Sequence, residues 1–291
     1  MVLIRSDKKG VPRRLYRLNW TPGNRILRLP KWIQPLALLY RERNVLRRYW
    51  LDRILYREQP EESERQVQEN LSLGAQYVYE ADVKGDIAEF GTMSGFTASI
   101  ISFAMSKFDK GWFRSRILQM PTDERFKPKK LFLFDSFQGL PVAESEVDKN
   151  SSHVRTGVWG TGSCLELSKE ELRGVCIRFL PSERIVIYDG WFKDTLPQIP
   201  SGTKFSMLHI DCDLYQSTVD VLDFCFSHGL LSEGAAIFFD DWNPNRASPQ
   251  LGERRAWSEI VEKYSIVYSD WGDYSWGGKR FLIHSYHRTI S

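Results

Sequence analysis

The sequence is poor in cysteine and has no long apolar run, and these shortages argue against several classes of protein. Its four cysteines show no Cys-x-x-Cys spacing, which argues against a zinc site and against a disulfide framework. We therefore expect reduced cysteines in the core of a cytoplasmic protein. The longest apolar stretch near the start, Leu36 to Tyr40, is far shorter than the roughly 20 residues that cross a bilayer. The arginine-rich start also lacks the small-residue cleavage site of a secretory signal, so we expect no such signal.

The charge of the chain is distributed unevenly, although its 42% apolar and 26% charged residues are ordinary for a globular protein. Residues 1–57 hold 15 Lys/Arg against three acids, whereas the rest of the chain holds 25 Lys/Arg against 34 acids. A basic arm on an acidic body predicts an anionic partner for the arm. That partner is a membrane surface, a charged glycan, or the acidic body of a sister subunit in a homo-oligomer. We expect no nucleic-acid partner.

Apolar residues at helical spacing predict one or two amphipathic helices over residues 31–58, and the helical pattern continues over residues 59–84. The amphipathic faces would pack on the core or on a second subunit, or would contact a membrane peripherally. We expect two units: a basic arm with amphipathic helices over residues 1–60, and a single domain over residues 61–291.

Short apolar runs alternate with helical segments in this domain, which predicts βαβ units and a mostly parallel sheet. Helices are expected over residues 96–108, 215–228 and 253–263, and a capping-box sequence opens a short helix at Ser168. The expected strands lie near residues 85–90, 131–134, 184–188, 205–210, 235–239, 266–269 and 279–284.

A glycine turn follows the first of these strands. The pattern Glu89-x-Gly91-x-x-x-Gly95 lacks the Gly-x-Gly-x-x-Gly spacing of dinucleotide folds and the Lys-Ser/Thr pair of a phosphate loop. It fits a loop that wraps an amino-acid tail, in which Glu89 bonds a cationic amine or organises the turn. The alternative is a tight turn without a ligand. Ser94 is a candidate cap for the helix that follows.

Asp135 ends the second strand, where an acid characteristically binds ribose hydroxyls. The alternative is a helix cap or a turn residue. Taken with the glycine turn, and without any basic cradle for phosphate, Asp135 indicates a nucleoside ligand that carries no phosphate.

Two later strands end in pairs of acids: Asp211 and Asp213 after the first, and Asp240 and Asp241 after the second. In an open α/β sheet, ligands bind outside the carboxyl ends of the strands. If these strands are parallel neighbours, four carboxylates converge and need a cation, for which Mg²⁺ or Mn²⁺ suits oxygen ligands. Asp213 could instead cap the next helix.

Five segments occur in an order that resembles the macrocin O-methyltransferase-like family of S-adenosylmethionine-dependent enzymes. They are Gly-Asp-Ile-Ala-Glu-Phe-Gly, Phe-Asp-Ser-Phe-Gln-Gly-Leu-Pro, Gly-Trp-Phe-Lys-Asp-Thr-Leu-Pro, His-Ile-Asp-Cys-Asp-Leu-Tyr-Gln-Ser-Thr and Phe-Asp-Asp-Trp. The resemblance covers roughly Gln66 to His284. It departs from the family in the glycine loop, which reads Thr-Met-Ser-Gly where relatives often carry an aromatic residue and an arginine. The basic arm has no counterpart.

The resemblance implies a class I methyltransferase fold: an α/β, Rossmann-like sheet of seven strands whose last strand is antiparallel, with a helical lid over the cofactor. It implies a divalent metal held by Asp211, Asp240 and Asp241, and Asp213 as the general base. The positions that it assigns to S-adenosylmethionine are Glu89, Gly91, Thr92, Ser94, Gly95, Asp135, Ser136, Asp189 and Asp211.

The expected activity is methyl transfer to a hydroxyl of a sugar or a glycosylated small molecule, with a small molecule or a glycan as acceptor. Two alternatives stay open. Asp211 and Asp213 form a D-x-D motif that metal-dependent glycosyltransferases use, and a methyltransferase-like domain could serve as a scaffold. Residues 142–162 and 243–252 are expected to shape the acceptor pocket. Trp242, Trp257 and Tyr215 could stack on a sugar or could lie in the core, and both interpretations stay open. For His209 we expect a position in the core.

Overall fold

The computed structural model of this chain describes residues 62–109 and 128–287. The basic arm, its amphipathic helices and the predicted boundary near residue 60 lie outside the described residues. None of the helices in the described part of the chain is both long and apolar enough to cross a membrane. All four cysteines are unpaired, and Cys176, Cys212 and Cys225 are buried, as expected.

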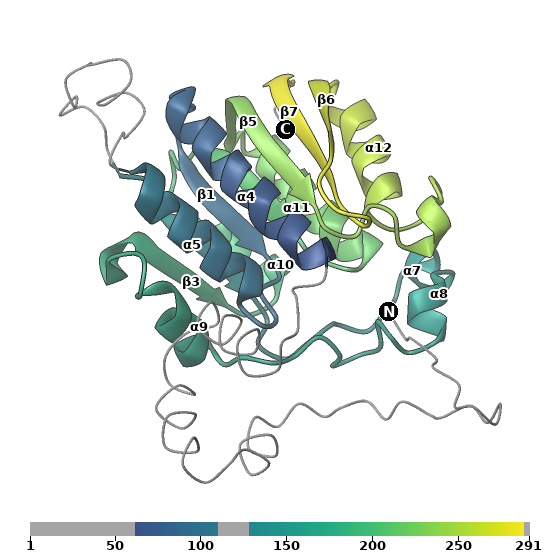
Figure 1. Cartoon of the computed structure of the whole chain (residues 1–291). Coiled ribbons are helices and arrows are strands. Elements are labelled where there is room, and N and C mark those ends of the chain that lie inside the picture. The colour runs from purple at the N-terminus through teal and green to yellow at the C-terminus, as the bar shows by residue number, and fades with distance from the viewer. Residues whose placement is uncertain (1–61, 110–127, 288–291) are drawn as a thin grey trace, which may run out of the picture. The chain divides into compact units, whose positions relative to one another are not determined.

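A seven-stranded sheet forms the centre of the described region, with the strand order β3-β2-β1-β4-β5-β7-β6 (Figure 1). The first five strands pair in parallel, and β7 runs antiparallel to both of its neighbours. This arrangement confirms the predicted class I architecture. The strands are β1 (Asp86–Phe90), β2 (Leu131–Asp135), β3 (Ile185–Asp189), β4 (Phe205–Ile210), β5 (Leu231–Phe239), β6 (Val267–Asp273) and β7 (Lys279–Ser285).

Helices cover both faces of the sheet, which is why its central strands read as continuous apolar runs. One face packs against α4 (Glu62–Glu80), α5 (Phe96–Phe108) and α9 (Lys169–Cys176). The other packs against α11 (Tyr215–Ser227) and α12 (Gly252–Tyr264), with α10 (Phe192–Thr195) nearby (Figure 1). All six residues of β4 are buried, because this strand lies at the middle of the sheet between both layers.

The polar segment at residues 142–162 is ordered into short helices, α7 (Glu146–Lys149) and α8 (Ser152–Arg155). Ser145 caps α7 and Ser151 caps α8, each through a side-chain oxygen. The Ser168 capping box at the start of α9 is present as predicted, with Glu171 as its partner. Asp148 of α7 accepts hydrogen bonds from the backbone amides of Tyr215 and Gln216 at the start of α11, which places this segment beside the carboxyl end of β4.

Candidate functional site

A row of backbone hydrogen bonds continues past the carboxyl ends of the parallel strands and aligns the predicted site residues. Gly91 N donates to Phe134 O, Asp211 N to Phe90 O, and Asp240 N to Ile210 O, each over 2.9 Å. The residues that directly follow β1, β4 and β5 are thereby held side by side at the carboxyl ends of these strands. The acids that follow β4 and β5 consequently lie on neighbouring, parallel strands, as the sequence predicts.

Gly91 is required by this close packing. Its φ is +87°, and a Cβ atom at this position would lie 1.9 Å from the carbonyl oxygen of Asp211. Any other residue would therefore push β4 away from β1 at the site. The structure thus explains Gly91 by the close approach of the neighbouring strand, and its contact with the cofactor stays a prediction.

Three of the four predicted acids form a tight cluster. Asp211, Asp213 and Asp241 each direct a carboxylate oxygen to within 4.8 Å of the others. Asp213 adopts a left-handed backbone conformation with φ 58°, which is uncommon for a residue with a side chain and marks a conformation that the surroundings impose. Asp240 is not one of these three acids, and its Oδ1 accepts a 2.7 Å hydrogen bond from Tyr274. The cluster thus contains Asp213 where the resemblance implied Asp240.

Asp213 does not cap the helix that follows it, so this alternative interpretation is wrong. The N-cap of α11 is Leu214, which makes no side-chain cap bond. The first backbone amides of α11, which have no partner within the helix, are instead bonded by the buried carboxylate of Asp148. This carboxylate accepts from Tyr215 N over 2.7 Å and from Gln216 N over 3.2 Å. Because Asp148 performs the capping, the carboxylate of Asp213 is available to the cluster.

Burial and the charges of neighbouring acids raise the pKa values of these carboxyl groups. Burial, followed by the charge of Asp240, raises the pKa of Asp213 to about 7. Burial and the charges of Asp240 and Asp241 raise the pKa of Asp211 well above its usual value. The pKa of Asp241 is raised by burial and by Asp213. Carboxylates that repel one another in this way are stabilised by a cation between them.

The donor set fits a hard divalent cation. Two oxygen ligands of one Mg²⁺ lie about 3 to 4 Å apart, close to the 4.8 Å limit within which the three carboxylate oxygens lie. The nearby thiol of Cys164 is not one of the clustered groups, and burial and the charge of Asp213 raise its pKa to about 12. Oxygen ligands without thiolate favour Mg²⁺ or Mn²⁺ over zinc.

Glu253 is a further acid at this site that the sequence analysis missed. It is fully buried at the start of α12, and its Oε2 accepts from the backbone amide of Asp241 over 2.9 Å. Its Oε1 has no hydrogen-bond partner among the described residues. Glu253 therefore fixes the turn that carries Asp241. An acid in the first turn of a predicted helix was the signal that the sequence offered.

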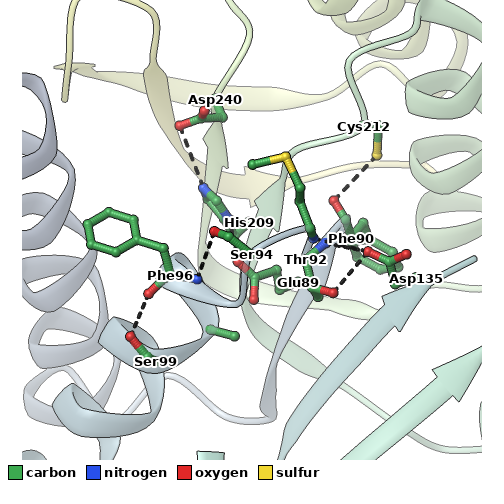
Figure 2. Close-up of polar contacts among 12 residues, drawn as sticks. Glu89, Phe90, Thr92, Ser94, Phe96, Ser99, Asp135, His209, Cys212 and Asp240 are labelled. Atoms are coloured by element: carbon green, nitrogen blue, oxygen red, sulfur yellow. Dashed lines mark hydrogen bonds and ion pairs between the residues drawn. The ribbon is translucent and has the colours of Figure 1, made fainter. Parts of the chain in front are cut away.

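The glycine loop between β1 and α5 is held by Asp135. One carboxylate oxygen accepts from Thr92 N, Thr92 Oγ1 and Met93 N over 2.7 to 3.2 Å (Figure 2). The other accepts from Phe137 N over 2.8 Å. Asp135 thus organises the loop that the sequence assigned to the cofactor, which is the turn role left open above. Its ribose contact stays a prediction.

The other predicted cofactor residues occupy different positions around this loop. Gly95, with φ 69°, is the N-cap of α5, while Ser94 Oγ lies one residue earlier and accepts from Phe96 N over 3.3 Å (Figure 2). Ser94 is therefore not the N-cap. Ser136 donates to Gly139 O over 2.8 Å. Asp189 is exposed at the end of β3, where Lys169 Nζ lies 3.7 Å from its carboxylate.

Glu89 lies near the end of β1, where it pairs with His209 of β4. It is fully buried, its Oε1 lies 3.0 Å from His209 Nδ1, and its Oε2 has no hydrogen-bond partner among the described residues. His209 is also fully buried, which confirms its core position. Glu89 does not line the pocket described next, so its predicted contact with an amine finds no support in this geometry.

A pocket of about 270 Å³ joins the glycine loop to the acid cluster. The first turns of α4 border one wall. The turn between β6 and β7 borders another and carries Trp276, whose side chain is 64% exposed. The lining residues include Ser63, Val67, Thr92, Met93, Ser94, Asp211, Asp240, Asp241, Trp276 and Gly277. A ligand in this pocket contacts both predicted sites at once.

The aromatic residues proposed to stack on a sugar are placed elsewhere. Trp242 is 9% exposed and Trp257 is 3% exposed, and both pack against Phe239 and Phe281 in the core. The phenol of Tyr215 donates to Glu259 over 2.5 Å. Two of the three are core residues, and Trp276 is the exposed aromatic residue that lines the pocket.

The two loops expected to shape the acceptor pocket are bonded to each other. The buried side chain of Asn245 accepts at Oδ1 from Ser151 Oγ over 2.7 Å and from Ser152 N over 3.1 Å. Asn245, Arg246 and Ala247 have φ values of 58°, 61° and 54°. Three consecutive left-handed residues are strained, and such strain persists where the surroundings impose it.

Comparison with known proteins agrees with this geometry. The sequence profile of the macrocin O-methyltransferase (TylF) family matches residues 64–265. A tetracenomycin-C rhamnosyl 4'-O-methyltransferase of Streptomyces olivaceus is 28% identical over 60% of this chain and 59% of its own length. The demethyldecarbamoylnovobiocin O-methyltransferase of Streptomyces niveus is 28% identical over the same shares. The matched segment thus spans about 59% of these relatives.

Among solved structures, the O-methyltransferase NovP is similar with a TM-score of 0.57 and 25% identity, over 76% of this chain and 80% of that one. The calicheamicin methyltransferase CalS11 shares the fold, with a TM-score of 0.50. The family match and these relatives give the glycosyltransferase alternative no support. The profile match covers more than half of the sequence, so the chain belongs to the macrocin O-methyltransferase (TylF) family.

Proposed function

We propose that this chain is an S-adenosylmethionine-dependent O-methyltransferase that acts on a hydroxyl of a sugar or of a glycosylated small molecule, with the help of a divalent cation. The observation that carries the proposal is the pocket in which the glycine loop and the acid cluster face one ligand space. The family membership and the names of the relatives, which are methyltransferases of sugar-linked natural products, support the acceptor class.

The acid cluster supplies the groups that the reaction needs. Asp213 is the proposed base, because its carboxylate is not used to cap α11 and lies among the clustered oxygens. It takes the proton of the acceptor hydroxyl while that oxygen attacks the methyl carbon in line and the bond to sulfur breaks. When bound, a divalent cation stabilises the negative charge that develops on the acceptor oxygen. Asp211 and Asp241, with Asp240 beside them, are the proposed ligands.

The glycine loop supplies the proposed binding site for the cofactor. Thr92, Met93 and Ser94 line the pocket on the side of α5, and Asp135 holds the loop amides in place. We keep Asp135, Ser136 and Asp189 as proposed contacts of the nucleoside. A rigid loop beside the acid cluster would exclude water and orient the methyl group toward the acceptor.

Calorimetry distinguishes the proposed class from the glycosyltransferase alternative. The full chain should bind S-adenosylhomocysteine in the micromolar range and should not bind a UDP-sugar at about 1 mM, because the loop lacks a phosphate cradle. A methyl-transfer screen against a panel of glycosides then identifies the acceptor. Binding of the UDP-sugar without binding of S-adenosylhomocysteine would reject the proposal.

Trp276 is the proposed stacking residue for the acceptor. Its turn is anchored by Asn243, which donates from Nδ2 to Trp276 O over 2.7 Å and from its backbone to Gly277 O over 2.9 Å. Trp276→Ala should raise the acceptor KM about 10-fold, since losing an apolar contact of this size costs roughly 1.5 kcal/mol. The value of kcat should change less than about twofold, because the stacking contact is equally strong in the transition state.

Val267→Ala is the matched control, because Val267 is exposed on the adjacent strand β6 and does not line the pocket. Steady-state kinetics with the identified acceptor measure both variants. An unchanged acceptor KM in Trp276→Ala would remove Trp276 from the acceptor site.

The partners of the basic arm remain proposals from the sequence. They are self-association with the acidic body and contact with an anionic surface, in a protein that we propose to be cytoplasmic. The residues concerned lie outside the described part of the chain.

A further inference from the structure

A buried chain of hydrogen bonds runs from Asp240 into the core beneath the pocket. Tyr274 Oη donates to Asp240 Oδ1 over 2.7 Å, and His209 Nε2 lies 3.3 Å from the same phenol oxygen. His209 Nδ1 in turn lies 3.0 Å from Glu89 Oε1. The ring of His209 is directed toward Asp240 (Figure 2). Because Glu89 and His209 are fully buried and Tyr274 is 2% exposed, water does not interrupt the chain.

The directions of the two hydrogen bonds at Tyr274 follow from the number of hydrogens. A tyrosine hydroxyl carries one hydrogen, and the geometry assigns that hydrogen to Asp240. His209 must then donate from Nε2 to the phenol oxygen. A phenol that receives one hydrogen bond donates its own hydrogen more strongly, because neighbouring bonds in a chain polarise one another. The chain therefore ends on one defined oxygen of Asp240.

In these surroundings the hydrogen-bonded polar residues lower the stability of the folded protein. Glu89 and His209 are paired residues on adjacent strands of a face that is otherwise apolar, with Ile87, Met207 and Phe238 close by. One oxygen of Glu89 has no hydrogen-bond partner among the described residues, and such a group destabilises the folded state. Apolar residues of similar volume would pack here without that cost. A role beyond packing explains the polar set.

We infer that Tyr274 is a positioning residue for Asp240, supported from behind by His209 and Glu89. This inference rests on the proposed function, in which Asp240 belongs to the cation site. By fixing Oδ1, Tyr274 prevents the carboxylate from rotating and leaves its other oxygen for the pocket. The four residues come from β1, β4, the end of β5 and the β6–β7 turn, so only the folded sheet assembles them. Groups that orient a metal ligand typically change metal affinity by about 10- to 100-fold when removed.

Tyr274→Phe tests the inference, because it removes only the hydroxyl. The ring itself is held by Phe238, at 5.3 Å between centroids, and by the backbone at Gly278. In the full chain, titration with Mn²⁺ alone, followed by electron paramagnetic resonance, should show about 10- to 100-fold weaker binding than in the wild type. Binding of S-adenosylhomocysteine should stay within about twofold, because Tyr274 does not line the pocket.

Tyr264→Phe is the matched control. Tyr264 is equally buried, and its hydroxyl donates to a carboxylate, that of Asp223, over 2.7 Å in the layer on the other face of the sheet. This variant should lose stability in a thermal melt, since it also loses a partly buried hydrogen bond to a carboxylate, but its Mn²⁺ affinity should stay within about twofold. A purely structural role for Tyr274 would give the two variants the same Mn²⁺ affinity.

Each outcome supports or overturns the inference. A Tyr274→Phe variant that binds Mn²⁺ as the wild type does would overturn it and leave the proposed function intact. A wild type that binds S-adenosylhomocysteine but no Mn²⁺ would overturn both the inference and the cation in the proposed function. If Tyr274→Phe does not fold, the His209→Gln variant tests the inference. A weakening of Mn²⁺ binding by about threefold or more supports the role of the hydrogen bonds behind Asp240, and unchanged binding overturns it.

Discussion

Asp213→Asn should reduce kcat by at least about 100-fold, since a positioned general base contributes 10²- to 10⁴-fold to a rate. The amide has nearly the shape of the carboxylate but cannot accept the proton of the acceptor hydroxyl. Affinity for S-adenosylhomocysteine should stay within about twofold, because Asp213 belongs to the acid cluster and is not among the residues that line the pocket. Single-turnover methyl transfer and calorimetry measure the two quantities separately.

The fold should tolerate this substitution. Burial, and then the charge of Asp240, raises the pKa of Asp213. A neutral side chain there avoids both the burial of a charge and the repulsion from Asp240, so the melting temperature should hold or rise. Asp220→Asn is the matched control on α11, where Asp220 accepts from Gln216 over 2.8 Å, and it should leave kcat unchanged. Normal turnover by Asp213→Asn would reject Asp213 as the base.

Removal of divalent cations should abolish turnover, and Mg²⁺ or Mn²⁺ should restore it. A Lewis acid at such a site contributes several kcal/mol to transition-state stabilisation, so exhaustive EDTA treatment should lower the rate by roughly 100-fold or more, at about 1.4 kcal/mol for each tenfold. The physical reason is the cluster of Asp211, Asp213 and Asp241 within 4.8 Å, whose mutual repulsion a cation neutralises.

Thermal stability gives an independent measure of the same cation. Mn²⁺ at about 100 times its dissociation constant should stabilise the folded chain by roughly 2.7 kcal/mol, because it binds the assembled cluster and not the unfolded chain. The double variant Asp211→Asn/Asp241→Asn should lose this stabilisation. Full activity after chelation, together with a melting temperature that does not change when Mn²⁺ is added, would show that methyl transfer at the acid cluster needs no metal.

The sequence predicted the elements of this site because each of them is local. A run of apolar residues followed by an acid marks the carboxyl end of a buried strand, which is how Asp135, Asp211 and Asp240 were found. The helix predicted over residues 96–108, after the glycine turn, has the bounds of α5. Neighbouring parallel strands then bring their ends together without further information.

The contacts that decide what each acid does were out of reach of the sequence. Asp148 caps α11 from a segment 67 residues earlier, and nothing near Asp213 in the sequence shows that its capping role is already filled. Tyr274 reaches Asp240 across 34 residues. The tryptophans show the same limit: composition cannot tell the buried Trp242 from the exposed Trp276.

By itself, the sequence determined the sheet, the order of its strands along the chain and the set of acids at their ends, because apolar periodicity and strand-ending residues depend on neighbours in the chain. Only the tertiary structure decided which carboxylates meet, which one is held by Tyr274, and which aromatic residue borders the pocket. Those outcomes depend on packing contacts and hydrogen bonds between side chains from distant segments. These contacts form only when the helices pack on the sheet.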